Sequence, residues 1–227
     1  IYLEAGLRTY DLAHPYPEEG YRQMIARLSD INLCPTNISK DNLTLEKTKG
    51  ESFVVGNTVL DNLLPYKEKC EYTNKVLVTL HRRENHKLMD QWFREVNRLA
   101  RENSDLEFIL PLHPNPDVQV HKNLLTHVNV ISPLSHPSLL GILCQCKLVI
   151  SDSGGIQEEG SFLNKKIIVC RKTTERPEGK VSGHLIMCES PENLYRIFND
   201  LKYNYEIEEE CPYGDGDSSS KIATLLN

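Results

Sequence analysis

From residue 75 onward the chain alternates short runs of aliphatic and β-branched residues with longer amphipathic segments. Short apolar runs are typical of buried parallel strands, and the amphipathic segments are typical of helices that cover a sheet. The pattern predicts strands at Val76–Leu80, Glu107–Leu112, Val128–Ile131, Lys147–Ser151, Lys166–Cys170 and His184–Cys188, and helices near Asp90–Asn103, Asp117–Thr126, Ser138–Gln145, Gly155–Phe162 and Pro191–Leu201. This order is that of a doubly wound α/β domain.

The first sixty residues carry a shorter version of the same alternation. They predict a strand that ends at Glu4, a helix near Glu19–Leu28, a strand at Asp30–Leu33, a helix at Ser39–Glu46 and a strand at Phe53–Val55. Because the chain starts with Ile1 inside an expected strand, we expect it to be processed or a piece of something longer. Residues 1–60 are then the remainder of a second α/β domain, and Asn57–Lys69 is a plausible hinge.

Composition narrows the class of protein. The 227 residues include 39% hydrophobic side chains and a net charge of −6, which excludes a disordered chain and argues against a general nucleic-acid binder. No apolar run approaches the roughly 18 residues that span a bilayer, and no signal peptide is recognisable, so we expect a cytoplasmic protein without a membrane partner. The seven cysteines are scattered, which favours reduced thiols over disulfides or a metal site.

In open α/β sheets, ligands bind beyond the carboxyl ends of the strands. The segment Ser151–Glu159 lies at such a strand end, and its Ser153, Gly154 and Gly155 open the following helix. Backbone N–H groups there could hold a diphosphate, or the turn could simply cap a helix. Glu159, one turn further, could accept hydrogen bonds from sugar hydroxyls. Neither the dinucleotide-binding nor the Walker pattern occurs.

Basic and imidazole side chains follow three other predicted strands. His81 and Arg82 come after the first strand of the main domain, His113 follows the second, and Arg171 and Arg176 follow the Lys166–Cys170 strand. Each segment alone could be a solvated charged turn. Together they gather positive charge at one sheet edge of an acidic chain, as an anionic ligand requires.

The amino-terminal residues supply carboxylates instead. Glu4 ends a strand, and Glu18 and Glu19 lie in a Pro-rich loop before Arg22. Facing the basic edge across a cleft, these groups could act as general acid and base on a sugar. They could equally form salt bridges with the arginines, and the spacing leaves both interpretations open.

Several of these motifs resemble, in the same order, those of the non-hydrolysing UDP-N-acetylglucosamine 2-epimerases, and the resemblance covers essentially the whole chain. The matching segments are Leu3–Thr9, Pro17–Glu19 with Arg22, Gly56–Thr58, His81–Glu84, Ser151–Glu159, Thr174–Glu178 and Pro212–Gly216. The resemblance implies a GT-B-like α/β fold of two Rossmann-like domains with parallel sheets, of which the N-terminal one is incomplete here. Residues 61–205 would form the C-terminal UDP-binding domain, and a helix within 206–227 would pack back on residues 1–60.

The resemblance also implies an activity and a partner. The family interconverts UDP-GlcNAc and UDP-ManNAc by eliminating UDP to a 2-acetamidoglucal and adding it back, without a cofactor. Such enzymes feed the synthesis of ManNAc-containing polysaccharide, and a homodimer is expected.

Individual residues match the positions of the family. Glu4, Glu18 and His81 match catalytic residues. The matches to substrate-binding positions are Arg22, Arg82, His113, Ser153, Gly154, Gly155, Glu159 and Arg176. Among these, Arg82 and His113 match positions associated in some bacterial members with a second, allosteric UDP-GlcNAc.

The chain departs from the family at two residues and lacks two of its motifs, and alternatives stay open. Leu139 stands where an aromatic ring often stacks on uracil, and Tyr21 stands where Asn commonly precedes Arg22. A Gly-Thr-Arg-Pro-Glu strand and a His-Gly-Asp-Thr segment with a catalytic Asp are also absent. The alternatives are therefore an inactive nucleotide-sugar-binding fragment, and a hydrolysing relative that releases ManNAc and UDP.

Overall fold

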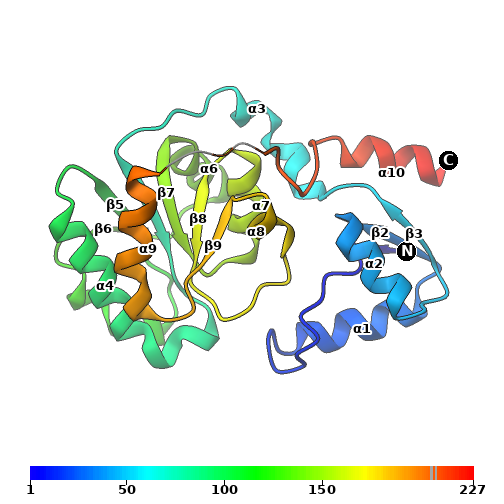
Figure 1. Ribbon diagram of the computed structural model, residues 1–227, viewed down its shortest axis with the longest axis horizontal. Coiled ribbons are helices and arrows are strands. Elements are labelled where there is room, and N and C mark those ends of the chain that lie inside the picture. The colour runs from blue at the N-terminus through cyan, green and yellow to red at the C-terminus, as the bar shows by residue number, and fades with distance from the viewer. Residues whose placement is uncertain (205–206, 208) are drawn as a thin grey trace.

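The structure is a computed structural model that describes residues 1–204, 207 and 209–227. Its described strands form two parallel sheets (Figure 1). The first sheet has three strands in the order β1-β2-β3, and the second has six in the order β6-β5-β4-β7-β8-β9. The strands are β1 Tyr2–Leu3, β2 Ile31–Cys34, β3 Glu51–Val54, β4 Lys75–Thr79, β5 Glu107–Pro111, β6 Asn129–Ile131, β7 Cys146–Ser151, β8 Lys166–Val169 and β9 Leu185–Met187.

Helices connect the parallel strands, as parallel pairing requires. The α-helices are α1 Glu18–Leu28, α2 Asn37–Leu45, α3 Leu64–Lys67, α4 Met89–Glu102, α5 Pro116–Gln119, α6 His136–Gln145, α7 Gly154–Phe162, α8 Glu178–Val181, α9 Pro191–Tyr203 and α10 Ser218–Leu226. Short 3-10 helices lie at η1 Thr58–Leu63, η2 Arg83–Leu88 and η3 Lys122–Leu124. The expected α/β alternation is therefore confirmed in both parts of the chain.

The second sheet has an apolar cluster on each face, because alternate side chains of a strand point to opposite faces. Val76 and Val78 of β4 pack with α4 and α9 on one face, whereas Leu77 packs with residues of α6 and α7 on the other. On α4 the buried side chains are Met89, Trp92, Phe93, Val96, Leu99 and Ala100, which follow the three-to-four-residue spacing of one helix face. The sheet is therefore covered on both sides, and its carboxyl edge stays open to ligands.

The loop after β1 is held close to α2. Gly6 has a φ of +85°, and a Cβ there would lie 2.0 Å from the Ser39 carbonyl oxygen, so only glycine fits. Beside it the Arg8 guanidinium forms a bidentate pair with Glu46, at 2.6 and 3.0 Å. These contacts fix the direction in which the chain leaves β1 toward α1.

The segment between the two sheets, which the sequence predicts to be a hinge, contains two short helices. It forms η1 and α3, and the Asp61 carboxylate of η1 accepts hydrogen bonds from the Ser218 and Ser219 amides at the start of α10 (3.0 and 2.7 Å). Figure 1 shows α10 beside the first sheet, near β3. A groove between them is lined by Phe53 and Val54 from one side and by Thr224 from the other.

Two sequence expectations need comment. The single helix expected at Asp117–Thr126 is wrong, because the structure has the short α5 and η3 there. The expected boundary between the main domain and the C-terminal segment falls at residues 205 and 206, which, like 208, lie outside the described residues.

Within the described part of the chain, no helix has both the length and the apolar character needed to cross a membrane.

Candidate active site

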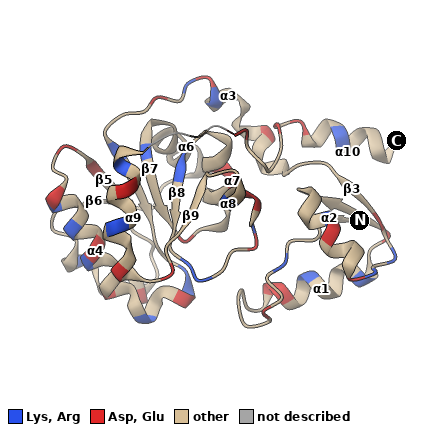
Figure 2. Ribbon diagram, in the orientation of Figure 1, with Lys and Arg blue, Asp and Glu red and all other residues tan. Residues whose placement is uncertain are grey.

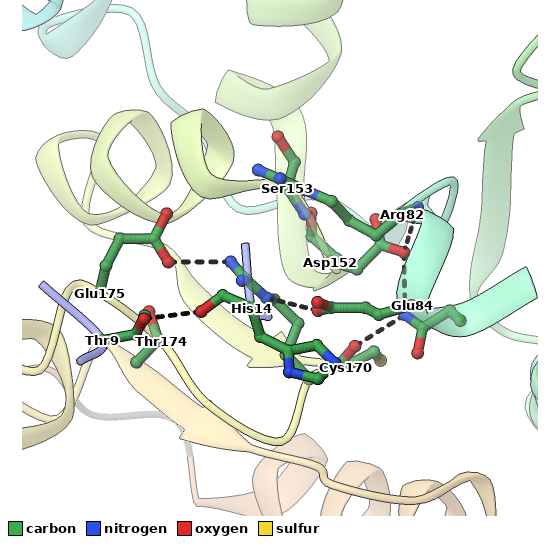
Figure 3. Close-up of polar contacts among 12 residues, drawn as sticks. Thr9, His14, Arg82, Glu84, Asp152, Ser153, Cys170, Thr174 and Glu175 are labelled. Atoms are coloured by element: carbon green, nitrogen blue, oxygen red, sulfur yellow. Dashed lines mark hydrogen bonds and ion pairs between the residues drawn. The ribbon is translucent and has the colours of Figure 1, made fainter. Parts of the chain in front are cut away.

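Asp152, directly after β7, organises the turn that follows β4. Its carboxylate is fully buried and accepts hydrogen bonds from the His81 amide (3.0 Å), the Arg82 amide (2.8 Å) and the Asn85 side-chain amide (2.9 Å). Asn85 also donates to the Cys170 carbonyl at 2.9 Å, so the turns after β4, β7 and β8 are joined (Figure 3). This network holds the turn that carries His81 and Arg82 at the open edge of the sheet.

The His81 side chain is partly buried, with 33% of its surface exposed. Its ring stacks on His113, with centroids 5.0 Å apart and planes 13° from parallel, and its Nδ1 is 3.7 Å from an Asp152 oxygen. Burial lowers the pKa of His81, and the neighbouring His113 and Arg82 act in the same direction, while Asp152 opposes them. The lowered pKa favours the neutral imidazole near pH 7, which has one nitrogen that donates a hydrogen bond and one that accepts.

The turn Ser153–Gly155 opens α7 beneath the side chain of Arg176. A Cβ on Gly154 would lie 2.7 Å from Arg176 Nη1, so glycine is needed for the guanidinium to cover the helix start. A Cβ on Gly155 would meet no atom within 4 Å, so there is free space on that side of the turn. The amino end of α7 thus combines free space, backbone donors and nearby positive charge, the features that favour a bound phosphate.

Three buried charged groups, Arg171, Glu175 and Arg176, form a network behind that turn with the exposed Glu84. Glu175 accepts from Arg176 Nη1 at 2.5 Å and from Arg171 Nη1 at 3.1 Å, and Arg171 Nε also donates to Glu84 at 2.8 Å (Figure 3). Burial alone would raise the pKa of Glu175, but the charges of Arg176 and Arg171 outweigh it and lower the pKa to about 2. Figure 2 shows both basic and acidic positions along the loop between β8 and α8. The loop is fixed by ion pairs before any ligand arrives.

Arg176 also pairs with Glu158 of α7, its Nε lying 2.8 Å from a Glu158 oxygen. Burial raises the pKa of Glu158, Arg176 opposes that shift, and the charge of Glu4 adds to it. The charge of Glu4, beside the first sheet, therefore influences the pKa of Glu158 in α7. The Glu4 backbone has a φ of +57°, a left-handed conformation that is uncommon for a residue with a side chain.

The loop of residues 9–17 is held by Glu19, which is fully buried. The Glu19 carboxylate accepts from the Thr9 amide at 3.0 Å and from the Tyr10 amide at 3.2 Å. Glu18, its neighbour, is exposed. Three residues after Glu19 on α1, Arg22 reaches the second part of the molecule, with its Nη2 3.7 Å from Glu175. Glu19 is thus structural, and Glu18 is the carboxylate left accessible.

Two cavities meet at His81. The first, here called the cleft, has a volume of about 540 Å³ and separates the residues 13–18 from the turn 81–86. Glu18 lines one wall of the cleft, and His81 and Arg82 line the other. The second, here called the side pocket, has a volume of about 170 Å³ and is lined by Thr79, His81, Pro111, His113, Pro133, Leu134, Leu139, Ser153 and Ile156. His81 belongs to both cavities.

Glu159 lies deeper along α7 with one polar partner from α6. Its Oε1 is 2.8 Å from Nε2 of His136, which is 49% exposed, whereas Glu159 is 7% exposed. Burial raises the pKa of Glu159, and the hydrogen bond to His136 opposes that shift.

Five of the eleven predicted site residues line the cleft or the side pocket, whereas Glu4, Arg22, Gly154, Gly155, Glu159 and Arg176 line neither. His81, Arg82, His113 and Ser153 line the two cavities, as does Glu18. Arg171 was expected among the ligand-facing cations, but it is buried and paired with Glu84 and Glu175. Asp152, Asn85 and Glu175 were not singled out as candidates. The signal for Asp152 is its place in the Ser151–Glu159 motif, which becomes meaningful once β4 and β7 are known to be neighbours.

Comparison with known proteins places this geometry in a family. A family model described as UDP-N-acetylglucosamine 2-epimerase matches residues 1–227. A Bacillus subtilis protein named UDP-N-acetylglucosamine 2-epimerase is 36% identical over 99% of this chain and 65% of its own length. The crystal structure of UDP-GlcNAc 2-epimerase from Neisseria meningitidis bound to UDP-GlcNAc is 35% identical, with a TM-score of 0.91 over 99% of this chain and 68% of that one. The Methanocaldococcus jannaschii enzyme in complex with UDP-GlcNAc and UDP is 29% identical, with a TM-score of 0.82 over 99% and 67%.

The fold is thus GT-B-like, an α/β architecture of two parallel sheets, of which this chain holds only part. The chain belongs to the UDP-N-acetylglucosamine 2-epimerase family. It spans about two thirds of the length of the relatives it matches.

Proposed function

We propose that the protein acts as a non-hydrolysing UDP-N-acetylglucosamine 2-epimerase that interconverts UDP-GlcNAc and UDP-ManNAc. One observation carries the proposal: His81 of the second sheet lines both the cleft that contains Glu18 and the side pocket that contains Ser153. A nucleoside diphosphate bound at the second sheet would therefore place its sugar within reach of carboxylates from the first.

The residues suit a reaction by elimination and re-addition. A carboxylate, Glu4 or Glu18, takes the proton from C2 of the sugar, and the C1–O bond breaks with its electron pair leaving on UDP. The 2-acetamidoglucal then receives UDP again at C1 and a proton at C2 from the opposite face. The reaction is redox-neutral and uses no cofactor. Enzymic proton transfer of this kind contributes about 10²–10⁴-fold to the rate.

The second sheet holds UDP while its bond to the sugar is broken. The Ser153–Gly155 turn offers backbone donors to the diphosphate, and neutral His81 donates a hydrogen bond to the leaving oxygen. Arg82 adds positive charge at the wall of the cleft. Arg176, already paired with Glu158 and Glu175, acts here by covering the start of α7. The side pocket receives the base, with Leu139 on one of its walls.

The product UDP-ManNAc would supply the synthesis of ManNAc-containing polysaccharide, and we propose that the enzyme works as a homodimer. The family resemblance supports both parts. Light scattering on the product of the complete gene checks the oligomeric state, with a mass of two subunits expected.

Proton NMR of UDP-GlcNAc incubated with the product of the complete gene tests the proposed reaction. We expect UDP-ManNAc to grow to a constant ratio with no free ManNAc. Growth of ManNAc and UDP in equal amounts would instead identify a hydrolysing enzyme. Binding of UDP without any turnover would identify a nucleotide-sugar-binding protein, and would contradict the proposal.

A further inference from the structure

The pair formed by His136 and Glu159 has no role in the reaction described above. His136 is the first residue of α6, and Glu159 lies in the middle of α7. In the part of the chain that the structure describes, His136 is the one side chain hydrogen-bonded to the Glu159 carboxylate. A buried carboxylate with a single, half-exposed partner at the edge of a ligand site is well placed to bind a ligand group with its second oxygen.

The pair lies one helical turn from the wall of the side pocket. Leu139 follows His136 by three residues on α6, and Ile156 precedes Glu159 by three residues on α7. Residues three apart lie on the same face of a helix, so the pair forms a polar rim beside the apolar Leu139 and Ile156. The amino end of α7, with Ser153 and Gly155, lies on the same helix.

This arrangement matches the parts of a nucleotide. The pentose joins the base to the diphosphate, so a base in the side pocket and a diphosphate at the start of α7 leave the pentose beside Glu159. Two vicinal hydroxyls of a ribose are hydrogen-bond donors, and an ionised carboxylate is an acceptor for both. His136 Nε2 occupies one carboxylate oxygen at 2.8 Å and thereby fixes the plane of the group.

We propose that His136 is a positioning residue, which orients the Glu159 carboxylate toward the ribose hydroxyls and so sets the preference for ribonucleotides over 2′-deoxyribonucleotides. The inference rests on the proposed function, since it takes a uridine nucleotide as the ligand. The inference adds His136 of α6 to the binding site. It predicts that His136 changes the ratio of the affinities for UDP and 2′-deoxy-UDP, and not both affinities equally.

Calorimetry with UDP and 2′-deoxy-UDP on the product of the complete gene tests the assignment. We expect the unaltered protein to bind UDP about tenfold or more tightly than 2′-deoxy-UDP, as a charged hydrogen bond to the missing hydroxyl implies. His136→Phe should reduce that ratio to about threefold or less by weakening UDP alone. His136→Gln, whose amide nitrogen can replace Nε2, should keep most of the ratio.

Glu159→Gln supplies the matched comparison. It should lower the ratio as His136→Phe does, and the double variant should show no further loss, because the two residues act as one unit. An unchanged ratio in His136→Phe, or an equal loss of both nucleotides, would overturn the positioning role. An unaltered protein that binds no UDP would overturn the proposed function itself, and the assignment with it.

Discussion

The two sides of the cleft differ in how the charged groups beside them are held. Behind the wall formed by the turn 81–86, Asp152, Arg171 and Glu175 are at most 3% exposed, and each has at least two polar partners. On the side of the first sheet, Glu18 is exposed and Glu4 is half-buried. Glu19 is buried there and accepts hydrogen bonds from the Thr9 and Tyr10 amides, so it holds the loop rather than facing the cleft.

The difference assigns separate tasks to the walls. Groups that must hold a diphosphate gain from being fixed in advance, because no reorganisation is then needed when negative charge develops. A carboxylate that exchanges a proton with a substrate has to stay accessible to it.

His81, which belongs to both cavities, should show the largest effect. We expect His81→Ala to lower the turnover of UDP-GlcNAc by about 10²–10⁴-fold, because it removes the group that lines both cavities and that we propose as the hydrogen-bond donor to the leaving oxygen. Initial rates followed by NMR provide the measurement. His127→Gln, an exposed histidine before β6, is the control and should keep the full rate. Equal rates for the two variants would contradict a catalytic role for His81.

Glu175 should show the strongest dependence of stability on pH. Its pKa is about 2 in the folded protein and about 4.3 when unfolded, so its contribution is present above pH 5 and is lost as the pH falls toward 2. Glu175→Gln should unfold about 3 kcal/mol more easily at pH 7, since two buried guanidinium groups lose a partner. Its stability should also fall less steeply between pH 5 and 3. Urea unfolding at several pH values tests this, and parallel curves for the two proteins would contradict it.

Gly154→Ala tests the fit between α7 and Arg176. The new Cβ would lie 2.7 Å from a guanidinium nitrogen that two ion pairs hold in place, so we expect a loss of about 1–3 kcal/mol in stability. In α6, Gly141→Ala meets no atom within 4 Å and should raise stability by up to about 1 kcal/mol. Thermal unfolding should therefore move in opposite directions. A rise in both melting temperatures would show that Arg176 does not constrain the turn.

Leu139→Phe should give the smallest change, confined to the side pocket. An aromatic ring adds a stacking interaction with the base worth about 0.5–1.5 kcal/mol, which corresponds to UDP binding about 2–10-fold tighter. Calorimetry with UDP measures this, and pyrophosphate, which has no base, should bind with unchanged affinity. Weaker binding of UDP would place the base elsewhere.

The sequence was sufficient for most of the second sheet, because its strands are buried on both faces and appear as continuous apolar runs. The helix expected at Asp117–Thr126 failed since its centre, His121 to Asn123, is polar and only Val118 and Leu125 are buried. No continuous apolar face exists there to hold a longer helix against the sheet.

The sequence indicated which motifs form the candidate site, but it did not indicate which residues of those motifs pair with one another. Asp152 meets the turn of His81 because β4 and β7 are neighbours, although some seventy residues separate them. Arg171 turned inward because Glu84 and Glu175, from two different loops, meet it there. Such partners depend on strand order, which an alternating pattern does not specify.

The division of tasks between the walls is tested most directly by Glu18→Gln in the product of the complete gene. Two quantities are measured on the same preparation: the affinity for UDP by calorimetry, and the exchange of the C2 proton of UDP-GlcNAc in D₂O by NMR. We expect C2 exchange to fall by about 10²-fold or more while the affinity for UDP stays within about twofold. Loss of UDP binding in parallel with exchange, or full exchange in the variant, would contradict the account.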